Sequence, residues 1–443
     1  MMKRLSAVTG VLFAALLVTG CPEKKADTPT TDTPADTADT PKAPELKAGP
    51  GVDLEKKVVR IGTLDDLSGP GAAIGKPYAQ GKRLLAARIN AGGSGLLPEG
   101  WTVELVERDH GYNPTNAIKA YKEIREEILF LGTTFGTPNT LPLMPHLEAD
   151  KLVAFPASLS SKLAENKHTP PIGTPYKLEA ERAMDWAVEQ AGGADKVKAG
   201  IVYQQDDYGA DGLAGWEASA ARHGVEIVSK QAIAPGQKDF AATITGLKDA
   251  GATHVLLTTL PSATGPVLGT AAQLKYMPIW IGNTPSWVDI FFEDKPLPNA
   301  VMVNFHWVIG LPFWGEPSGG MTTFLEAFEK HGGENKRQDF YTLVSYLQGL
   351  VQIEALNRAI AAGDVTREGY LAALGTIEDF SGDGLTRPMN MKNFPYRTSD
   401  LSRVLKPDFE KKSWTVVSDF AAPGAAAPAA PADEEPADEA PAE

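Results

Sequence analysis

The chain has 443 residues and one cysteine, Cys21, which excludes intramolecular disulfides and cysteine-based metal sites. Its formal net charge is -14, and residues 58–420 alone carry -8 without a basic stripe. This acidic balance argues against nucleic acid as a partner and against direct adhesion to anionic lipid.

The N-terminus has the features of a lipoprotein signal peptide. Lys3 and Arg4 form a short positive region, and the apolar run over 11–18 has secretory-signal length but is too short to span a bilayer. The sequence Leu-Val-Thr-Gly before Cys21 resembles the lipobox of bacterial lipoproteins. We expect residues 1–21 to be a signal peptide and a lipid on Cys21 to anchor the chain to a membrane of the cell envelope, on the periplasmic or extracytoplasmic side. A plain signal peptide with a chance cysteine is the alternative.

Two segments have compositions that do not support a folded core. Residues 22–57 are rich in Thr, Pro, Asp, Ala and Lys, and residues 421–443 consist mainly of Ala, Pro, Asp and Glu with no basic residue. Neither segment has enough large apolar residues to offset the entropy of ordering the chain. We predict a disordered linker over 22–57 and a disordered acidic tail over 421–443.

The first part of the remaining chain alternates between short apolar strands and helices. Gly92 and Gly93 stop the first helix, and Asn113 followed by Pro114 begins the second. Alternation at this spacing predicts a parallel, doubly wound sheet. The expected strands cover 58–64, 101–108, 128–131 and 152–155, and the expected helices cover 77–90, a segment that begins at 114, and 138–149.

The same alternation restarts after Tyr176 and predicts a second α/β unit. Near 301–304 the pattern changes to two long helices, over 322–331 and 339–361, which we expect to cover the first unit. The expected strands cover 199–203, 225–229 and 254–257, and the expected helices cover 178–190, 209–223, 240–250 and 263–274.

The 363 residues from 58 to 420 exceed what one hydrophobic core usually serves, so two lobes are predicted. We assign residues 58–175 and about 305–375 to lobe 1, and residues 176–304 and about 376–420 to lobe 2. The hinge is expected near Tyr176 and Val303.

Four local motifs occur in a characteristic order. They are Ile-Gly-Thr-Leu-Asp-Asp-Leu-Ser-Gly-Pro at 61–70, Asp109 with Pro114, Asp-Asp-Tyr-Gly at 206–209, and Ala-Pro-Gly-Gln-Lys-Asp-Phe at 234–240. Together they resemble type I periplasmic binding proteins of the branched-chain amino acid (leucine/isoleucine/valine) ABC transporter family, over essentially all of 58–420. The resemblance implies two doubly wound parallel-sheet α/β lobes, joined by a multi-strand hinge, with a ligand cleft between them.

The same resemblance implies a function. It predicts an extracytoplasmic, monomeric solute-binding lipoprotein that closes its lobes on a small molecule and delivers it to an ABC permease in the cytoplasmic membrane. A ligand-sensing receptor component of the same fold, with no transport role, is the alternative. A lipoprotein enzyme without a recognisable motif is a more distant third.

The resemblance also implies ligand-binding residues at the carboxyl ends of the strands. Thr137 matches the family's small hydroxyl residue that binds the ligand carboxylate, Ser158 matches a second carboxylate-binding loop, and Tyr208 matches a tyrosine that closes over the ligand. Each has a plain structural alternative, as a helix N-terminal threonine, a turn cap and a packed loop tyrosine. The remaining candidates are Leu67, Ser68, Phe135, Gly136, Ala157, Leu260, Thr284 and Trp287.

The sequence departs from the family around Thr284. Amino-acid binders of the family usually have an acidic residue there that pairs with the ligand ammonium, whereas this chain has Gly-Asn-Thr-Pro-Ser-Trp. A buried ammonium without a carboxylate costs several kcal/mol. Asp65, Asp66 or Asp207 would have to replace that acid. The ligand class therefore stays open between an amino-acid-like compound, an amide and a carboxylate, including aromatic compounds.

Catalytic motifs are not found in the sequence. The glycines at 69, 71 and 75 miss the dinucleotide-binding spacing by one residue, no nucleophile elbow occurs, and the seven histidines are scattered. We therefore predict no enzymatic activity, no cofactor and no metal site.

Overall fold

The computed structural model describes residues 46–294, 297–334 and 336–425. The predicted signal peptide, Cys21, residues 22–45 of the predicted linker and residues 426–443 of the predicted tail lie outside these ranges. Over the described ranges, no helix combines the length and the apolar character that crossing a membrane requires.

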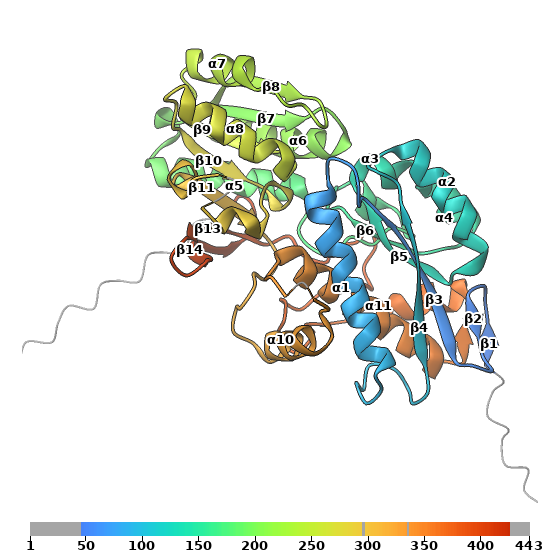
Figure 1. Cartoon of the computed structure of the whole chain (residues 1–443). Coiled ribbons are helices and arrows are strands. Elements are labelled where there is room, and N and C mark those ends of the chain that lie inside the picture. The colour runs from blue at the N-terminus through green and yellow to red at the C-terminus, as the bar shows by residue number, and fades with distance from the viewer. Residues whose placement is uncertain (1–45, 295–296, 335, 426–443) are drawn as a thin grey trace, which may run out of the picture. The chain divides into compact units, whose positions relative to one another are not determined.

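The first lobe is built on a five-stranded sheet (Figure 1). Its strand order is β2-β3-β5-β6, with β4 paired to β3, and all pairs except β2 with β3 are parallel. Ile61 faces one side of the sheet and Leu64 the other, so each side packs against its own helices. The strands are β2 (Val52–Asp53), β3 (Val58–Asp65), β4 (Thr102–Asp109), β5 (Phe130–Phe135) and β6 (Ala154–Ala157).

Helices cover both faces of this sheet. The first of them is α1, whose predicted start at Pro77 is wrong by five residues, because Pro usually marks a first turn but here lies inside the helix. The helical segments between the strands are α1 (Ala72–Asn90), α2 (Pro114–Ile124), α3 (Thr137–Thr140) and α4 (Met144–Ala149), with short 3-10 turns at Arg125–Glu127, Leu141–Leu143 and Leu163–Glu165.

The second lobe is built on a seven-stranded sheet of order β14-β13-β11-β10-β9-β7-β8. Strands β7 to β11 are parallel, and β13 and β14 are antiparallel additions at one edge. The strands are β7 (Lys198–Gln204), β8 (Glu226–Ile233), β9 (His254–Thr258), β10 (Ile279–Gly282), β11 (Phe305–Ile309), β13 (Ser402–Asp408) and β14 (Ser413–Ala421).

The helices of the second lobe lie on both sides of its sheet. Trp186 and Trp216 pack with Leu256 on one face, whereas Ile244 and Val267 lie in the core on the other face. The helical segments are α5 (Tyr176–Ala191), α6 (Asp207–His223), α7 (Ala241–Asp249), α8 (Pro261–Gln273) and α9 (Asn299–Met302), with 3-10 turns at Ala194–Lys196, η5 (Thr284–Ser286) and η6 (Asp289–Phe292).

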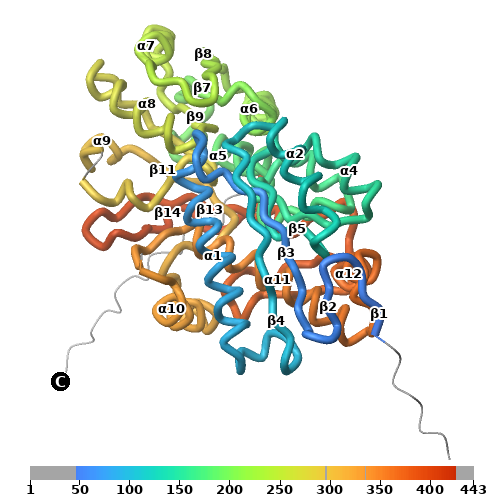
Figure 2. Tube along the Cα trace, turned by 45° about the vertical axis from the view of Figure 1, so that its right-hand side comes forward, coloured from blue at the N-terminus to red at the C-terminus, as the bar shows by residue number. Residues whose placement is uncertain are grey.

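The C-terminal helices α10 (Gly319–His331), α11 (Phe340–Ala361) and α12 (Arg367–Leu374) return to the first lobe (Figure 2). Helix α11 lies against α1 at close range because both helices carry a glycine there. A Cβ atom on Gly81 would lie 2.4 Å from the Thr342 carbonyl oxygen, and one on Gly349 would lie 2.4 Å from Leu85. These two glycines therefore permit the contact that places one face of α11 beside the cleft.

The segment boundaries differ in several places from those expected. Ala421, assigned to the tail, ends β14, and the carbonyl of Asp383, assigned to lobe 2, accepts from the Gly320 amide of α10 at 2.7 Å. Residues 305–309, assigned above to lobe 1, form β11, which pairs with β10 in the second sheet. Residues 46–57, assigned to the linker, belong to the folded body: β1 (Lys47–Ala48) pairs with β12 (Asp364–Val365), and β2 pairs with β3. Composition led to the wrong assignment of residues 46–57, because strands of two residues have too few apolar positions to show an alternating pattern.

Three segments of the chain meet where it passes between the lobes. The Gly173 amide donates to Thr398 Oγ1 at 3.0 Å, and Thr174 Oγ1 donates to the Leu401 carbonyl at 2.6 Å. The third segment contains Gly310, where a Cβ atom would lie 2.0 Å from Thr174 Oγ1. The crossing near Tyr176 is close to where we expected it. The second crossing follows β11, whereas Val303 precedes that strand and is 47% exposed.

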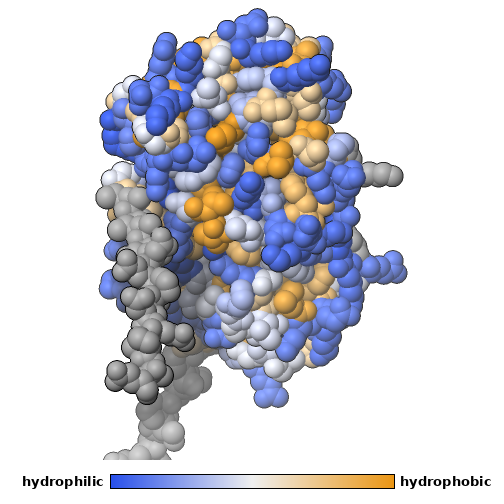
Figure 3. All heavy atoms as spheres, turned by 90° about the vertical axis from the view of Figure 1, so that its left-hand side faces the viewer, coloured by the Kyte–Doolittle hydropathy of each residue, from blue (hydrophilic) through white to orange (hydrophobic). Residues whose placement is uncertain are grey.

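The face of the molecule drawn in Figure 3 is mostly hydrophilic. Figure 3 shows separate apolar patches among hydrophilic residues on one face, without a continuous apolar band. Isolated exposed apolar side chains are normal on protein surfaces. The large exposed ones among the described residues are Met277, Val303, Leu325, Phe394, Val416 and Val417.

Trp287 lies in an aromatic core of the second lobe. Its side chain is fully buried, and its ring lies 4.6 Å from that of Trp414 and 4.9 Å from that of Phe292, measured between ring centroids. Its indole nitrogen donates to Asp289 Oδ1 at 3.1 Å. The structure thus places this sequence-predicted ligand contact in a packed interior.

We predict that Trp287→Ala lowers the free energy of unfolding by about 3 to 5 kcal/mol, because it removes a large buried ring and leaves a cavity. Urea denaturation measures this loss. Val416→Ala, at a 44% exposed position, is the control and should change stability by about 0.5 kcal/mol or less. A Trp287→Ala variant of unchanged stability would contradict the structural role.

Candidate ligand-binding site

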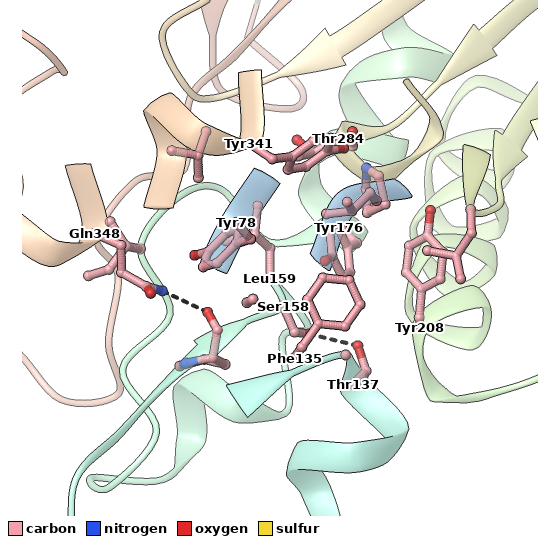
Figure 4. A pocket seen from close by; sticks show the side chains of 18 of the residues that line it. Tyr78, Phe135, Thr137, Ser158, Leu159, Tyr176, Tyr208, Thr284, Tyr341 and Gln348 are labelled. Carbon is pink, nitrogen blue, oxygen red and sulfur yellow. Dashed lines mark hydrogen bonds between the residues drawn. The ribbon is translucent and has the colours of Figure 1, made fainter. Parts of the chain in front are cut away.

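A pocket lies between the two lobes (Figure 4). The space between its side chains amounts to about 590 Å³, including the part open to solvent. Both lobes, the crossing segments and one face of α11 contribute to it. Its lining consists of Ile74, Tyr78, Tyr112, Phe135, Gly136, Thr137, Pro156, Ala157, Ser158, Leu159, Ile172, Tyr176, Tyr208, Leu260, Thr284, Pro285, Leu311, Tyr341, Val344 and Gln348.

Most of the sequence-predicted contacts meet in this pocket. They come from the carboxyl ends of parallel strands and from the turns that follow, where ligands of open α/β sheets bind. Gly136 makes the turn after β5: its φ is +85°, and a Cβ atom there would lie 2.8 Å from the ring of Tyr112. The predicted residues that line the pocket are Phe135, Gly136, Thr137, Ala157, Ser158, Tyr208, Leu260 and Thr284.

Leu67, Ser68 and Trp287 do not line the pocket. The loop after β3, which contains Leu67 and Ser68, is held by hydrogen bonds from its amides to two carboxylates outside the pocket lining. The Leu67 amide donates to Asp109 Oδ1 at 2.9 Å, and the Gly69 and Gly71 amides donate to Asp66. Ser68 is exposed. Trp287 lies in the aromatic core described above.

Sequence reasoning missed the contributions of α1 and α11. Tyr341, Val344 and Gln348 fall three and four residues apart on α11, so they share one face of that helix. The apolar periodicity of this segment predicted a buried helix, and Gln348 is one of several polar residues in it, so its polarity alone does not mark it as a pocket residue. The other missed lining residues are Ile74, Tyr78, Tyr112, Pro156, Leu159, Ile172, Tyr176, Pro285 and Leu311.

Two hydroxyl groups of the first lobe form a pair at the pocket wall. Thr137 Oγ1 lies 2.7 Å from Ser158 Oγ, and both side chains are buried. Ser158 Oγ also accepts a hydrogen bond from the Ser160 amide at 3.3 Å. Whichever hydroxyl donates within the pair, the proton of the other is left for a third group.

Tyrosines form the wall of the second lobe. The Tyr208 hydroxyl donates to Asn283 Oδ1 at 2.8 Å, and its ring packs edge-on against Tyr176 with centroids 4.9 Å apart. These contacts fix Tyr208 within its own lobe. Both rings therefore present rigid apolar surface to the pocket.

The lobes touch each other at the rim of the pocket. The Tyr112 hydroxyl of the first lobe donates to Asp206 Oδ2 of the second at 3.3 Å. Ser262 Oγ donates to the Pro70 carbonyl at 2.9 Å, and Lys162 Nζ lies 3.0 Å from Asp207 Oδ1. These contacts bring the two halves of the pocket together around one space.

No charged side chain is among the described residues that line the pocket, but ionisable groups lie directly behind the lining. Glu179 accepts from the Thr284 amide at 2.9 Å and from Thr284 Oγ1 at 2.5 Å, and burial raises its pKa to about 8. Lys82 Nζ donates to Gln348 Oε1 at 3.0 Å, and burial lowers the pKa of Lys82, which the nearby charge of Asp65 opposes. Burial also raises the pKa of Asp65 to about 7.

The described residues contain no group of three or more His, Cys, Asp and Glu side chains suited to holding a metal ion. The pocket offers hydroxyl, amide and aromatic groups instead. This composition suits non-covalent binding of a small molecule.

We predict that the chain loses stability as pH rises from about 6.5 to 8. Burial raises the pKa of Glu179 from 4.5 to about 8 in the folded protein. Between these two pH values the folded protein holds a proton on Glu179 that the unfolded chain has released. The stability that Glu179 contributes below pH 4.5 is therefore lost as pH rises through 8. His110 and His306, whose pKa values burial lowers to about 4, act in the opposite direction only below about pH 6.5.

Glu179→Gln should reduce this loss by about 1 kcal/mol, because the amide does not ionise. Denaturant unfolding at pH 6.5 and pH 8 measures it. Glu226→Gln, at an exposed position on β8, is the matched control and should keep the wild-type dependence. Identical pH dependence in Glu179→Gln and wild type would contradict the prediction.

Comparisons with known proteins agree with this geometry. Residues 58–396 match the periplasmic binding protein family. A Leu/Ile/Val-binding protein homolog 7 of Brucella abortus is 24% identical over 316 residues, which cover 68% of this chain and 77% of that protein.

Solved structures of similar proteins cover most of the chain. A fatty acid ABC transporter substrate-binding protein from Thermomonospora curvata has a TM-score of 0.77 and 25% identity, covering 85% of this chain and 94% of that one. A branched chain amino acid ABC transporter protein from Thermus thermophilus with bound valine has a TM-score of 0.74 and 18% identity, covering 83% and 97%. The two-lobed α/β architecture is therefore the type I periplasmic binding protein fold. This chain belongs to the periplasmic binding protein family and is of the substrate-binding type found with ABC transporters.

Proposed function

We propose that this protein is an extracytoplasmic solute-binding lipoprotein of an ABC importer. It takes a small molecule with an apolar body into the pocket between its lobes. The observation that carries the proposal is the pocket itself, in which Thr137 and Ser158 of the first lobe face Tyr176 and Tyr208 of the second around one space. A ligand in this space touches both lobes at once.

The ligand is amino-acid-like, an amide or a carboxylate. The similar protein from Thermus thermophilus has valine bound, and the similar protein from Thermomonospora curvata is described as a fatty acid binder. Both ligands combine an apolar body with a carboxylate. The pocket has the same two parts, an apolar wall that includes Ile74, Phe135 and Leu260, and a hydroxyl pair at Thr137 and Ser158.

Binding works by closure of the lobes. In the open form the rim contacts between Tyr112 and Asp206 and between Lys162 and Asp207 separate, and solvent reaches both walls of the pocket. A ligand that contacts both walls has its highest affinity for the closed form and shifts the population towards it. A permease in the cytoplasmic membrane then recognises the two lobes in their closed arrangement.

A ligand should therefore both stabilise and compact the protein. We predict that a true ligand at a hundred times its Kd adds about 2.7 kcal/mol of stability to refolded chain freed of bound solute. It should also reduce the radius of gyration in small-angle scattering. Tight binding without compaction would contradict lobe closure, and the absence of any hit among amino acids, amides and carboxylates in a folded sample would contradict the transport function.

The lipid on Cys21 holds this binding protein at the membrane surface. We predict that Cys21→Ser moves the protein from the membrane fraction to the soluble fraction, because one substitution removes the only acylation site in the sequence. Fractionation with labelled palmitate measures both distribution and acylation. Thr19→Ser keeps a small residue near the cleavage site and is the matched control. A Cys21→Ser protein that stays in the membrane fraction would contradict the proposal.

A further inference from the structure

The hydrogen-bonding groups around the pocket are unequally distributed between donors and acceptors. A carbonyl or carboxylate oxygen that already receives hydrogen bonds has little to offer a ligand, whereas a hydroxyl or amide N–H without a partner needs an acceptor. If the pocket wall has donors without a partner, the ligand is expected to bring acceptors, and if it has acceptors without a partner, the ligand is expected to bring donors.

Three acceptors at or directly behind the pocket wall already receive hydrogen bonds from the protein itself. The Pro156 carbonyl accepts from Gln348 Nε2 at 2.9 Å (Figure 4). The Thr284 carbonyl accepts from the Tyr341 hydroxyl at 2.8 Å and from Trp307 Nε1 at 3.2 Å, which uses both of its lone pairs. Glu179, which lies behind Thr284 in this wall, accepts one hydrogen bond from Thr284 on each carboxylate oxygen.

Gln348 is fixed so that it offers a donor and no acceptor. Its Oε1 accepts from Lys82 Nζ at 3.0 Å and from Gln352 Nε2 at 3.3 Å. Because an ammonium only donates and the Pro156 carbonyl only accepts, these two neighbours settle the orientation of the amide group. One N–H of Nε2 donates to Pro156, and the other N–H donates to no described residue.

Donors are left over in several places. The Thr137 and Ser158 pair has one proton more than its shared hydrogen bond uses. The Tyr176 hydroxyl shares a hydrogen bond with Ser158, so Thr137, Ser158 and Tyr176 form a chain of three hydroxyls that still has one proton to spare. The Tyr78 hydroxyl also lines the pocket and donates to no described residue. Together with Gln348 Nε2, these groups surround the space with donors from α1, α11 and both lobes.

From this inventory we infer that the ligand is a monocarboxylate with an apolar or aromatic body and without an ammonium group. This inference rests on the proposed function and narrows its ligand class. A carboxylate brings only acceptors and forms strong charge-assisted hydrogen bonds with the free hydroxyl and amide donors. An amide ligand brings N–H groups that need acceptors, and an ammonium needs a negative charge that the described lining does not supply.

The apolar part of the pocket fits the body of such an acid. Phe135, Tyr176 and Tyr208 provide ring surfaces, and Ile74, Leu260 and Val344 provide aliphatic ones. Acids that differ from natural amino acids only by the missing amino group are therefore suitable probes. Isocaproate corresponds to leucine in this sense, and hydrocinnamate corresponds to phenylalanine.

The test is calorimetric titration of residues 22–443, which lack the predicted signal peptide, unfolded and refolded to remove bound solute. The probes are isocaproate with leucine and isocaproamide, and hydrocinnamate with phenylalanine and hydrocinnamamide. We expect at least one acid to bind about 100-fold or more tightly than its matched amino acid and its amide.

Variants test the groups that the inference names. Thr137→Val removes a hydroxyl of nearly equal volume and should weaken acid binding about tenfold or more, whereas Thr415→Val on the exposed side of β14 should leave it unchanged. Gln348→Glu replaces the donor to Pro156 by a carboxylate, so acid binding should weaken and phenylalanine binding strengthen. Gln273→Glu, exposed at the end of α8, is the matched control.

The outcomes separate the inference from the function on which it rests. Binding of leucine or phenylalanine as tightly as the matched acid, or equal binding of acid and amide, overturns the ligand class and leaves the binding function intact. Acid binding that survives Thr137→Val and Gln348→Glu unchanged also overturns it, because the named donors would then be irrelevant. A folded protein that binds no member of the panel contradicts both.

Discussion

The direction of the parallel strands is the constraint on which the binding site depends. In each lobe the strands of the α/β unit run the same way, so their carboxyl ends, with the turns that follow, form one edge of the sheet. The two lobes are joined so that these edges face each other, which brings the turn after β5 and the residues after β6 opposite the start of α6 and the turn after β9. Residues of α1, α11 and the crossing segments complete the lining that these turns begin.

Local sequence predicted those pocket residues that lie in a turn or helix start with its own sequence signature. Gly136 followed by Thr137 marks a turn at a strand end, and Asp206 caps α6 through the amides of Tyr208 and Gly209, so both motifs could be recognised without a structure. The alternation of strands and helices gave the architecture for the same reason. These features depend on neighbours within a few residues.

The rest depended on contacts between residues distant in sequence. Glu179 holds the turn at Thr284 by accepting from the Thr284 amide, although it lies more than a hundred residues earlier in the chain. Nothing in the sequence around Thr284 indicates this contact. Trp287 was itself a predicted contact, yet its ring is buried among Phe292 and Trp414. Likewise, the face of α11 that meets the cleft follows from its close packing on α1, which hydropathy does not reveal.

The path of the chain through the hinge has a consequence for how the protein folds. The first sheet needs α11, which arrives more than two hundred residues after α1, and the second sheet needs β13 and β14 from the end of the described chain. The first lobe lacks its C-terminal helices until α12 at Arg367–Leu374, and the second lacks its edge strands until β14 at Ser413–Ala421. Contacts of such long sequence separation form slowly, because closing the long loops costs entropy before the contacts repay it. Both lobes therefore wait for segments from the C-terminal part of the described chain before their sheets and helices are fully packed.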